Sequence, residues 1–266
     1  MTARRQSMLL ILLTLFGAFA FAFVTTEAVH EAGHYLMHRI YGARVGIHLD
    51  PFGSSRIVGG GASSAPMGPT SLAGPLFSLL VSAAILAVLW HWRRPLLLPL
   101  LLMFPVAMVQ EGVTFSLGLL TPGGDASFIV AWGVPAPVLV LLGAFLLICG
   151  VAWLALLLPL AGLSRDAGFG TRWLVTVISM VAFMALRLIV SVSFRSGDVT
   201  EGVVPPLFAV LLSLAAAGAF TPMQRWLGDK LGFVPWATAR TAAVCLGCAA
   251  GMIALQLLLP GAGAIT

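Results

Sequence analysis

Long apolar runs, each about the length of a membrane-spanning helix, dominate the chain. Window hydropathy separates seven of them, at 8–40, 69–91, 95–120, 134–160, 172–193, 203–221 and 237–259. A helix needs about 20 mainly apolar residues to cross a bilayer. The runs are continuous, whereas the strands of a transmembrane barrel alternate between apolar and polar residues. The pattern predicts an all-α fold, a polytopic transmembrane helical bundle of about six or seven spans.

The segment between the first two runs has a different character. Residues 42–68 are rich in glycine and proline, which break helices, while Arg56, Ile57 and Val58 favour the start of a short strand. Irregular backbone is tolerated at membrane depth only where protein or a water-filled cavity satisfies its polar groups. We therefore expect a glycine-rich irregular loop or a β-hairpin after the first span. An ordinary surface loop is the alternative.

Composition supports the membrane assignment. Hydrophobic residues make up 60% of the 266 positions and charged residues 9%, with a mean hydropathy of +1.05. A soluble domain carries about 25% charged residues, so this chain lacks the polar surface to be soluble. The net charge of +5 comes from basic residues that lie mainly between the apolar runs, where they suit lipid headgroups rather than nucleic acid. We expect an integral, multi-pass protein of the cell membrane, with its amino terminus in the cytoplasm.

Two features invite other interpretations. The first apolar run follows Arg4 and Arg5 and resembles a signal peptide, but it continues without a clear cleavage site, so we expect an uncleaved membrane helix. Cys245 and Cys248 form a C-x-x-C pair within an apolar run. Because a polar context is missing, we expect small buried helix residues rather than a redox or zinc site.

The strongest chemical signal is His30-Glu31-Ala32-Gly33-His34, inside the first apolar run. Residues four apart lie on one face of a helix, so the two imidazoles can bind one metal ion. Glu31 is then placed to act on a metal-bound water as general base. Ionisable residues within a membrane helix are costly and usually functional. The motif predicts a zinc centre with His30 and His34 as ligands.

A catalytic zinc normally takes three protein ligands and leaves one position open. Asp125 is the first candidate for the third ligand, because it follows a proline and two glycines that unwind the backbone between two apolar runs. Glu111, in the middle of the third run, is another. Further candidates lie in or beside the irregular loop: His48, Asp50 and His38.

At this point the chain resembles the site-2 proteases, which cut substrates within or beside the membrane. Three matches carry the resemblance: H-E-A-G-H at 30–34, A-G-P-L at 73–76 and P-G-G-D at 122–125. Their order and spacing also fit, and together they cover roughly residues 20–160. The chain departs from the family where an asparagine is common after the A-G-P stretch, since Ser78 stands there. It also lacks the usual asparagine ahead of the aspartate motif.

The resemblance implies a function and roles for single residues. His30, His34 and Asp125 would bind Zn²⁺, and Glu31 would be the catalytic base and acid. The region around 56–66 would correspond to a strand-forming loop that holds an extended substrate, with Arg56, Ile57 and Val58 able to pair with it by β-addition. Ser78 is a candidate donor to the oxyanion. The substrate would be a membrane protein with a transmembrane segment.

Several roles remain open at the level of sequence. Glu27 and His38 either orient the imidazoles or face headgroup water. Glu111 is either part of the site or a structural partner of Arg187, the basic residue deep in a later run. We expect an intramembrane metalloprotease core at 1–160 and additional transmembrane helices of unknown role at 161–266. The competing functions are a metal-ion transporter and a catalytically inactive membrane scaffold of the same fold; no regulatory partner is indicated.

Overall fold

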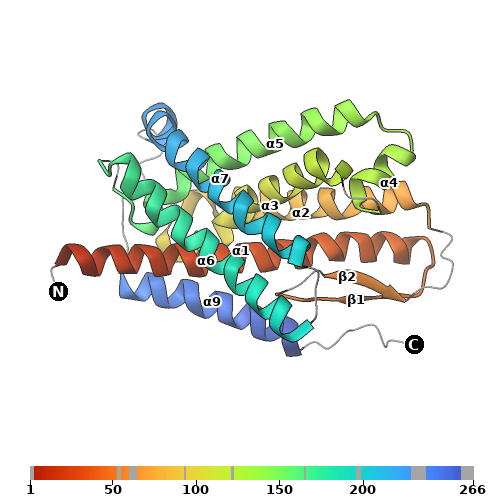
Figure 1. The fold of residues 1–266 in the computed structure, drawn as a ribbon, viewed down its shortest axis with the longest axis horizontal. Helices are drawn as coiled ribbons and strands as arrows, with labels where there is room; N and C mark the ends of the chain where they lie inside the picture. Colours follow the sequence, from red (N-terminus) through yellow and green to blue (C-terminus); the bar gives the residue numbers. More distant parts are fainter. Residues whose placement is uncertain are drawn as a thin grey trace.

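The computed structural model describes a bundle of long helices, one of which runs through its length (Figure 1). The described residues are 3–52, 55–59, 65–92, 94–120, 123–164, 166–195, 199–228 and 238–258. The side chains of residues 3–7, 191–195, 199–209, 227 and 228 lie outside the description. Within these limits the predicted all-α, polytopic helical bundle is confirmed.

The helices follow the apolar runs closely. They are α1 (Ala3–Ile40), α2 (Met67–Leu89), α3 (Leu98–Leu117), α4 (Asp125–Ala131), α5 (Ala136–Leu157), α6 (Phe169–Arg195), α7 (Val199–Met223) and α9 (Ala239–Leu258). Short 3₁₀ turns adjoin them at Trp90–Trp92, Pro95–Leu97, Gly118–Leu120 and Leu158–Ala161. A π-helical turn, Gln224–Gly228, continues α7.

Six helical segments of the described chain are long and apolar enough to cross a membrane. They are Met8–Ile40, Met67–Trp92, Pro95–Leu120, Ala136–Ala161, Phe169–Val190 and Ala239–Leu258. The seventh predicted run, 203–221, does form a helix, α7, but its first part falls where side chains are not described. The chain is therefore a multi-pass membrane protein, in agreement with the hydropathy pattern.

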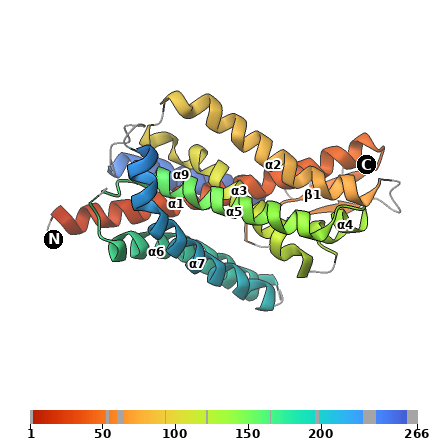
Figure 2. The same cartoon turned by 90° about the horizontal axis from the view of Figure 1, so that it is seen from above.

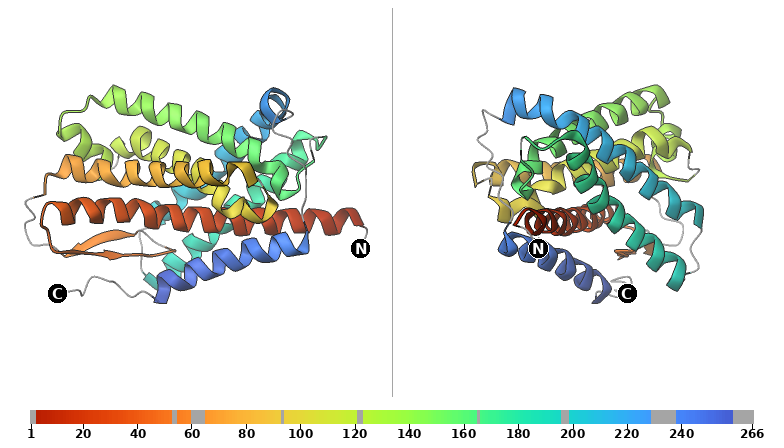
Figure 3. Two further views of the ribbon diagram at one scale, coloured as in Figure 1. Left: turned by 180° about the vertical axis from the view of Figure 1, so that it is seen from behind. Right: turned by 60° about the vertical axis from the view of Figure 1, so that its left-hand side comes forward.

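The glycine-rich segment forms the expected hairpin. Strand β1 (Val45–His48) pairs antiparallel with β2 (Arg56–Gly59), in the register that joins Val45 to Gly59 and His48 to Arg56. The turn out of α1 sets this up: Gly42 has a φ of 76°, and the Ala43 N–H donates to the His38 carbonyl at 2.9 Å. A left-handed glycine of this kind ends a helix without steric cost. Both strands contact α1, beside which the hairpin lies (Figure 3).

Helix α1 is the centre of the bundle. It contacts α2, α3, α6 and α9, with α2 on one side and the α6–α7 pair on the other (Figure 2). Small residues allow close approach at these contacts. Gly17 lies so near the Cys245 and Leu246 backbone of α9 that a Cβ would collide with it. Cys245 and Cys248 both lie in α9 as free thiols; Cys245 is buried, as expected, whereas Cys248 is half-buried.

One apolar core crosses the predicted boundary at residue 160. Buried members come from both parts of the chain, among them Leu15, Leu101 and Leu154 before the boundary and Phe183 and Leu212 after it. The helices at 161–258 therefore pack directly against the part of the chain that carries the H-E-A-G-H motif.

Candidate metal centre

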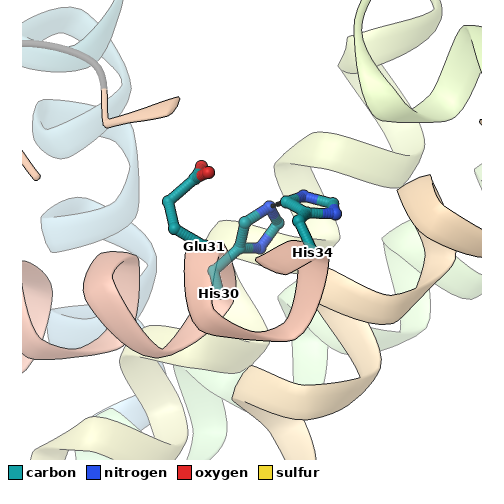
Figure 4. Close-up of side chains that lie close together, drawn as sticks. All are labelled: His30, Glu31 and His34. Atoms are coloured by element: carbon teal, nitrogen blue, oxygen red, sulfur yellow. Dashed lines mark hydrogen bonds between the residues drawn. The ribbon is translucent and has the colours of Figure 1, made fainter. Parts of the chain in front are cut away.

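The two histidines of α1 face each other across one helical turn. His30 and His34 have ring centroids 4.7 Å apart, and their Nε2 atoms are separated by 2.9 Å. Figure 4 shows the rings side by side, with the Glu31 side chain extending from the same turn in another direction. Ligand atoms of the three residues all lie within 4.8 Å of one another. The structure therefore brings the two imidazoles together on one face of α1, as the spacing of the motif predicts.

Asp125 completes the cluster from a different element. It is the first residue of α4, two positions after Gly123, which has a φ of 82°. Its Oδ2 lies 3.2 Å from His30 Nε2 and 3.3 Å from His34 Nε2. Burial raises the pKa of Asp125, but its interaction with the two histidines outweighs this effect and holds the pKa below its ordinary value. The structure thus brings the expected third ligand to the histidine pair as a carboxylate.

The outer nitrogens of both rings are fixed by acceptors. His30 Nδ1 lies 2.9 Å from Glu111 Oε1 on α3, and His34 Nδ1 lies 2.7 Å from the Thr70 carbonyl oxygen on α2. A carboxylate and a carbonyl can only accept, so each Nδ1 carries a proton and donates it. Each Nε2 then presents a lone pair to the centre, as a metal-binding histidine does.

The donor set fits a zinc ion. Tetrahedral zinc with bonds of about 2.0–2.1 Å separates its nitrogen and oxygen ligands by about 3.3–3.4 Å. The three distances among His30 Nε2, His34 Nε2 and Asp125 Oδ2 are 2.9, 3.2 and 3.3 Å. Three lone-pair atoms this close repel one another unless a cation lies among them. Two imidazoles and one carboxylate, with one position left open, are the ligands of catalytic zinc.

Glu111 supports the site rather than pairing with Arg187. Besides contacting His30, its Oε1 accepts a hydrogen bond from Ser78 Oγ at 2.6 Å. Ser78 is 0% exposed and Glu111 is 1% exposed. The structure gives the Ser78 hydroxyl another partner than the expected oxyanion, because it is fully buried and donates to Glu111. Ser78 instead fixes the carboxylate that orients His30.

Among the contacts of the described residues, neither Glu27 nor His38 has a hydrogen bond with the His30 or His34 imidazole. Glu27 forms an ion pair with Arg187 of α6, with 3.1 Å between Oε2 and Nη2. Its Oε1 accepts the Ser55 backbone N–H just before β2, at 3.3 Å. Nδ1 of His38 is buried and has no hydrogen-bond partner in the described part of the chain. Glu27 therefore ties α1 to α6 and to the hairpin.

Two glycines allow the H-E-A-G-H stretch of α1 and the A-G-P stretch of α2 to pack closely together. A Cβ on Gly33 would collide with the Ala73 carbonyl, and a Cβ on Gly74 would collide with the imidazoles of His30 and His34. The two stretches thus form the contact between α1 and α2 that brings the Thr70 carbonyl to His34. Sequence reasoning missed Thr70, because any residue type can supply a carbonyl.

The remaining candidates lie around the hairpin. Arg56, Ile57 and Val58 form most of β2, which confirms the predicted strand. His48 is the last residue of β1, opposite Arg56. Asp50 accepts the Phe52 N–H at 3.0 Å and so shapes the hairpin turn. These two residues therefore belong to the hairpin and its turn, while Asp125 lies against the histidine pair.

The candidate centre is assembled from four helices, with α1 providing the two histidines and the candidate base, α4 the aspartate, and α2 and α3 the acceptors at the outer ring nitrogens. The elements that meet α1 at the centre lie far from it in sequence: His30 and Glu111 are 81 positions apart, and His30 and Asp125 are 95 positions apart. No protein-family model matches this chain, and neither a curated protein nor a solved structure matches it.

Proposed function

We propose that the chain is an intramembrane zinc metalloprotease, which hydrolyses peptide bonds of membrane-protein substrates within or beside the bilayer. The observation that carries the proposal is the convergence of His30 Nε2, His34 Nε2 and Asp125 Oδ2 beside Glu31. The two histidines and Glu31 lie inside a helix long and apolar enough to span a membrane. The resemblance of the three sequence motifs to site-2 proteases points the same way.

The residues divide the chemistry among them. His30, His34 and Asp125 would hold Zn²⁺, which when bound supplies a Lewis acid that makes water acidic enough to be activated near neutral pH. Glu31 is half-buried and lines a cavity at the centre. It takes a proton from the attacking water and returns it to the leaving amine, the usual work of a carboxylate general base and acid.

The hairpin suits the delivery of an extended substrate. A peptide bond within a substrate helix is shielded by its own hydrogen bonds, so the helix must unwind locally before it is cut. Strand β2 pairs with β1 along one edge, and its residues are half-buried or exposed. The Ser55–Glu27 hydrogen bond anchors the start of β2 one helical turn before Glu31. A substrate strand added to β2 would run beside the catalytic turn of α1.

The two competing functions receive less support. A transport pathway passes ions between sites, whereas in the described chain one three-residue cluster stands out as a metal site. Its imidazoles are also fixed by Glu111 and by the Thr70 carbonyl, an arrangement that favours a resident ion. An inactive scaffold would not need Glu31 beside the ligands. These features favour catalysis.

Elemental analysis of purified protein tests the metal centre. Wild type should carry about one zinc per chain, and His30→Ala, His34→Ala and Asp125→Ala should lose it. Glu31→Gln should keep it, as should the matched control His38→Ala, which removes a histidine of the same helix. With an unfolded protein such as β-casein as substrate, Glu31→Gln should abolish cleavage. Full zinc retention by Asp125→Ala would assign the third ligand elsewhere, and zinc-free wild type after reconstitution would refute the proposal.

A further inference from the structure

A cavity of about 420 Å³ lies beside the candidate centre and is lined by two of its residues, His30 and Glu31. Gln110 and Thr114 of α3 line it as well. The remaining wall comes from α1, α3, α5, α6 and α7, so the cavity lies between the catalytic helix and the helices beyond residue 160. Its volume falls within the range of about 300–1,000 Å³ found for ligand pockets.

The interior of the cavity is apolar. Phe19 and Phe23 of α1, Val109 and Val113 of α3, and Met180 and Met184 of α6 form much of its surface. Methionine and phenylalanine side chains at such a surface adapt to ligands of different shape. An occupant of this region must therefore be hydrocarbon rather than charged or strongly hydrated.

The charged groups at the cavity wall are already engaged. Glu27 and Arg187 pair with each other at 3.1 Å, and the Arg187 guanidinium lies 4.6 Å from the centre of the Phe23 ring. Glu111 accepts from His30 and Ser78. These contacts favour an uncharged occupant.

Outside the Glu27–Arg187 ion pair, two residues of the wall, Gln110 and Glu111, have a buried oxygen without a hydrogen-bond partner in the described part of the chain. Gln110 Oε1 is buried and has no partner among the described residues. It lines the same cavity as Glu31, and a buried acceptor without a donor costs free energy. A peptide residue with an apolar side chain can donate its backbone N–H to Gln110 and place its side chain against the apolar wall. A lipid acyl chain makes only the apolar contact.

We infer that this cavity receives a bulky apolar side chain of the substrate, from the residue next to the bond that is cut. His30 and Glu31 line the cavity, so a side chain next to the reacting peptide bond can reach it. The inference rests on the proposed function and adds a substrate class: unwound membrane segments with a residue such as leucine, methionine or phenylalanine at that position. Val113 is the matching specificity-determining residue, because it is half-buried and lines the cavity.

Binding of two hydroxamates to the zinc-loaded protein in detergent tests the inference. Acetohydroxamate reaches only the metal, whereas 3-phenylpropanohydroxamate also carries an apolar group. Because one methylene in an apolar pocket is worth about 10–200-fold, wild type should bind the phenyl compound at least about tenfold more tightly. Val113→Phe should bring the ratio of the two affinities close to one and leave acetohydroxamate unaffected.

Two variants serve as controls. Val140→Phe makes the same change on α5 at a side chain that is 40% exposed, and it should keep the wild-type ratio. If Val113→Phe does not fold, Val113→Ala tests the same wall by enlarging it. That variant should shift the preference from the phenyl compound to its larger naphthyl analogue.

The outcomes separate this inference from the proposed function. If zinc content and acetohydroxamate binding are as expected but neither Val113 variant changes the affinity ratio, the inferred substrate pocket is wrong and the proposed function stands. A phospholipid that co-purifies with wild type and is lost from Val113→Phe, seen by native mass spectrometry, would assign the cavity to lipid and also overturn it. Absence of zinc and of binding by either compound would remove the metal centre and this inference with it.

Discussion

The two halves of α1 are buried in different ways. From Leu15 to Val24 the helix contributes small and apolar side chains to the core, and Ala18, Ala22 and Val24 are fully buried. From Glu27 to His34 it carries ionisable groups, and these are matched by polar partners. The partners come from separate helices: Thr70 of α2, Glu111 of α3, Asp125 of α4 and Arg187 of α6.

The difference shows that one continuous helix serves two kinds of interaction. Packing in the first half depends on size and close approach, as is usual between membrane helices. Contacts in the second half depend on particular atoms, because an unmatched polar group at membrane depth is costly. Damage to the first half should therefore reduce stability and leave zinc in place. Damage to the second half should act mainly on zinc or on a single partner.

The largest effect is expected for Gly74→Ala. A methyl group there occupies the space of the His30 and His34 rings, so we expect the variant to lose most of its zinc. Elemental analysis measures this. Gly251→Ala on α9 is the matched control, since its Cβ has nothing within 4 Å. Normal zinc content in Gly74→Ala would show that the two rings can move aside and still bind the metal.

Arg187→Leu should have the next largest effect, on stability. It leaves the half-buried Glu27 without its cation, and because breaking a fully buried pair costs about 3–5 kcal/mol, we expect a loss at or below the lower end of that range. Unfolding in mixed micelles of increasing SDS content measures this loss. Glu27→Gln combined with Arg187→Leu should recover part of the stability, because no unpaired charge remains. Equal losses in the single and double variants would show that the pair itself does not stabilise the fold.

A smaller loss of stability is expected for Gly17→Ala in the first half of α1. Its Cβ meets the Cys245–Leu246 backbone of α9, and overpacking of this kind costs about 1–3 kcal/mol. The folded fraction should nevertheless carry its normal zinc content. Gly247→Ala, which meets nothing within 4 Å on α9, should behave as wild type in the same unfolding assay. Zinc loss in Gly17→Ala would contradict the separation of the two halves.

The smallest effect is expected for Glu111→Gln, measured as zinc affinity by competition with a chelator. The amide oxygen can still accept from His30 Nδ1, but the negative charge that strengthens the ligand is lost. Removing an orienting partner costs about 10–100-fold in metal affinity, and we expect the lower end because one acceptor remains. Glu111→Leu should fall at the upper end. Equal affinities in wild type and both variants would show that Glu111 does not orient His30.

The sequence predicted the features that depend on local pattern. The apolar runs predicted the all-α membrane bundle, because a backbone in lipid must satisfy its own hydrogen bonds and a helix does so within one segment. Glycine and proline enrichment gave the hairpin region, and Arg56 to Val58 gave its second strand. The i, i+4 spacing placed His30 and His34 on one face, because the helix period is fixed by backbone geometry. Asp125 was a candidate because proline and glycine precede it.

Only the tertiary structure decided which distant group meets which. Glu27 could face His30, headgroups or a basic residue, and its partner proved to be Arg187. Ser78 was a candidate donor to the oxyanion from its place in the sequence, but the packing of α2 against α3 brings its hydroxyl to Glu111. The Thr70 carbonyl carries no side-chain signal, and the cavity beside Glu31 exists only where five helices meet. Local pattern is set by a few neighbouring residues, whereas these contacts depend on how whole helices pack, and many packings are compatible with the same run of apolar residues.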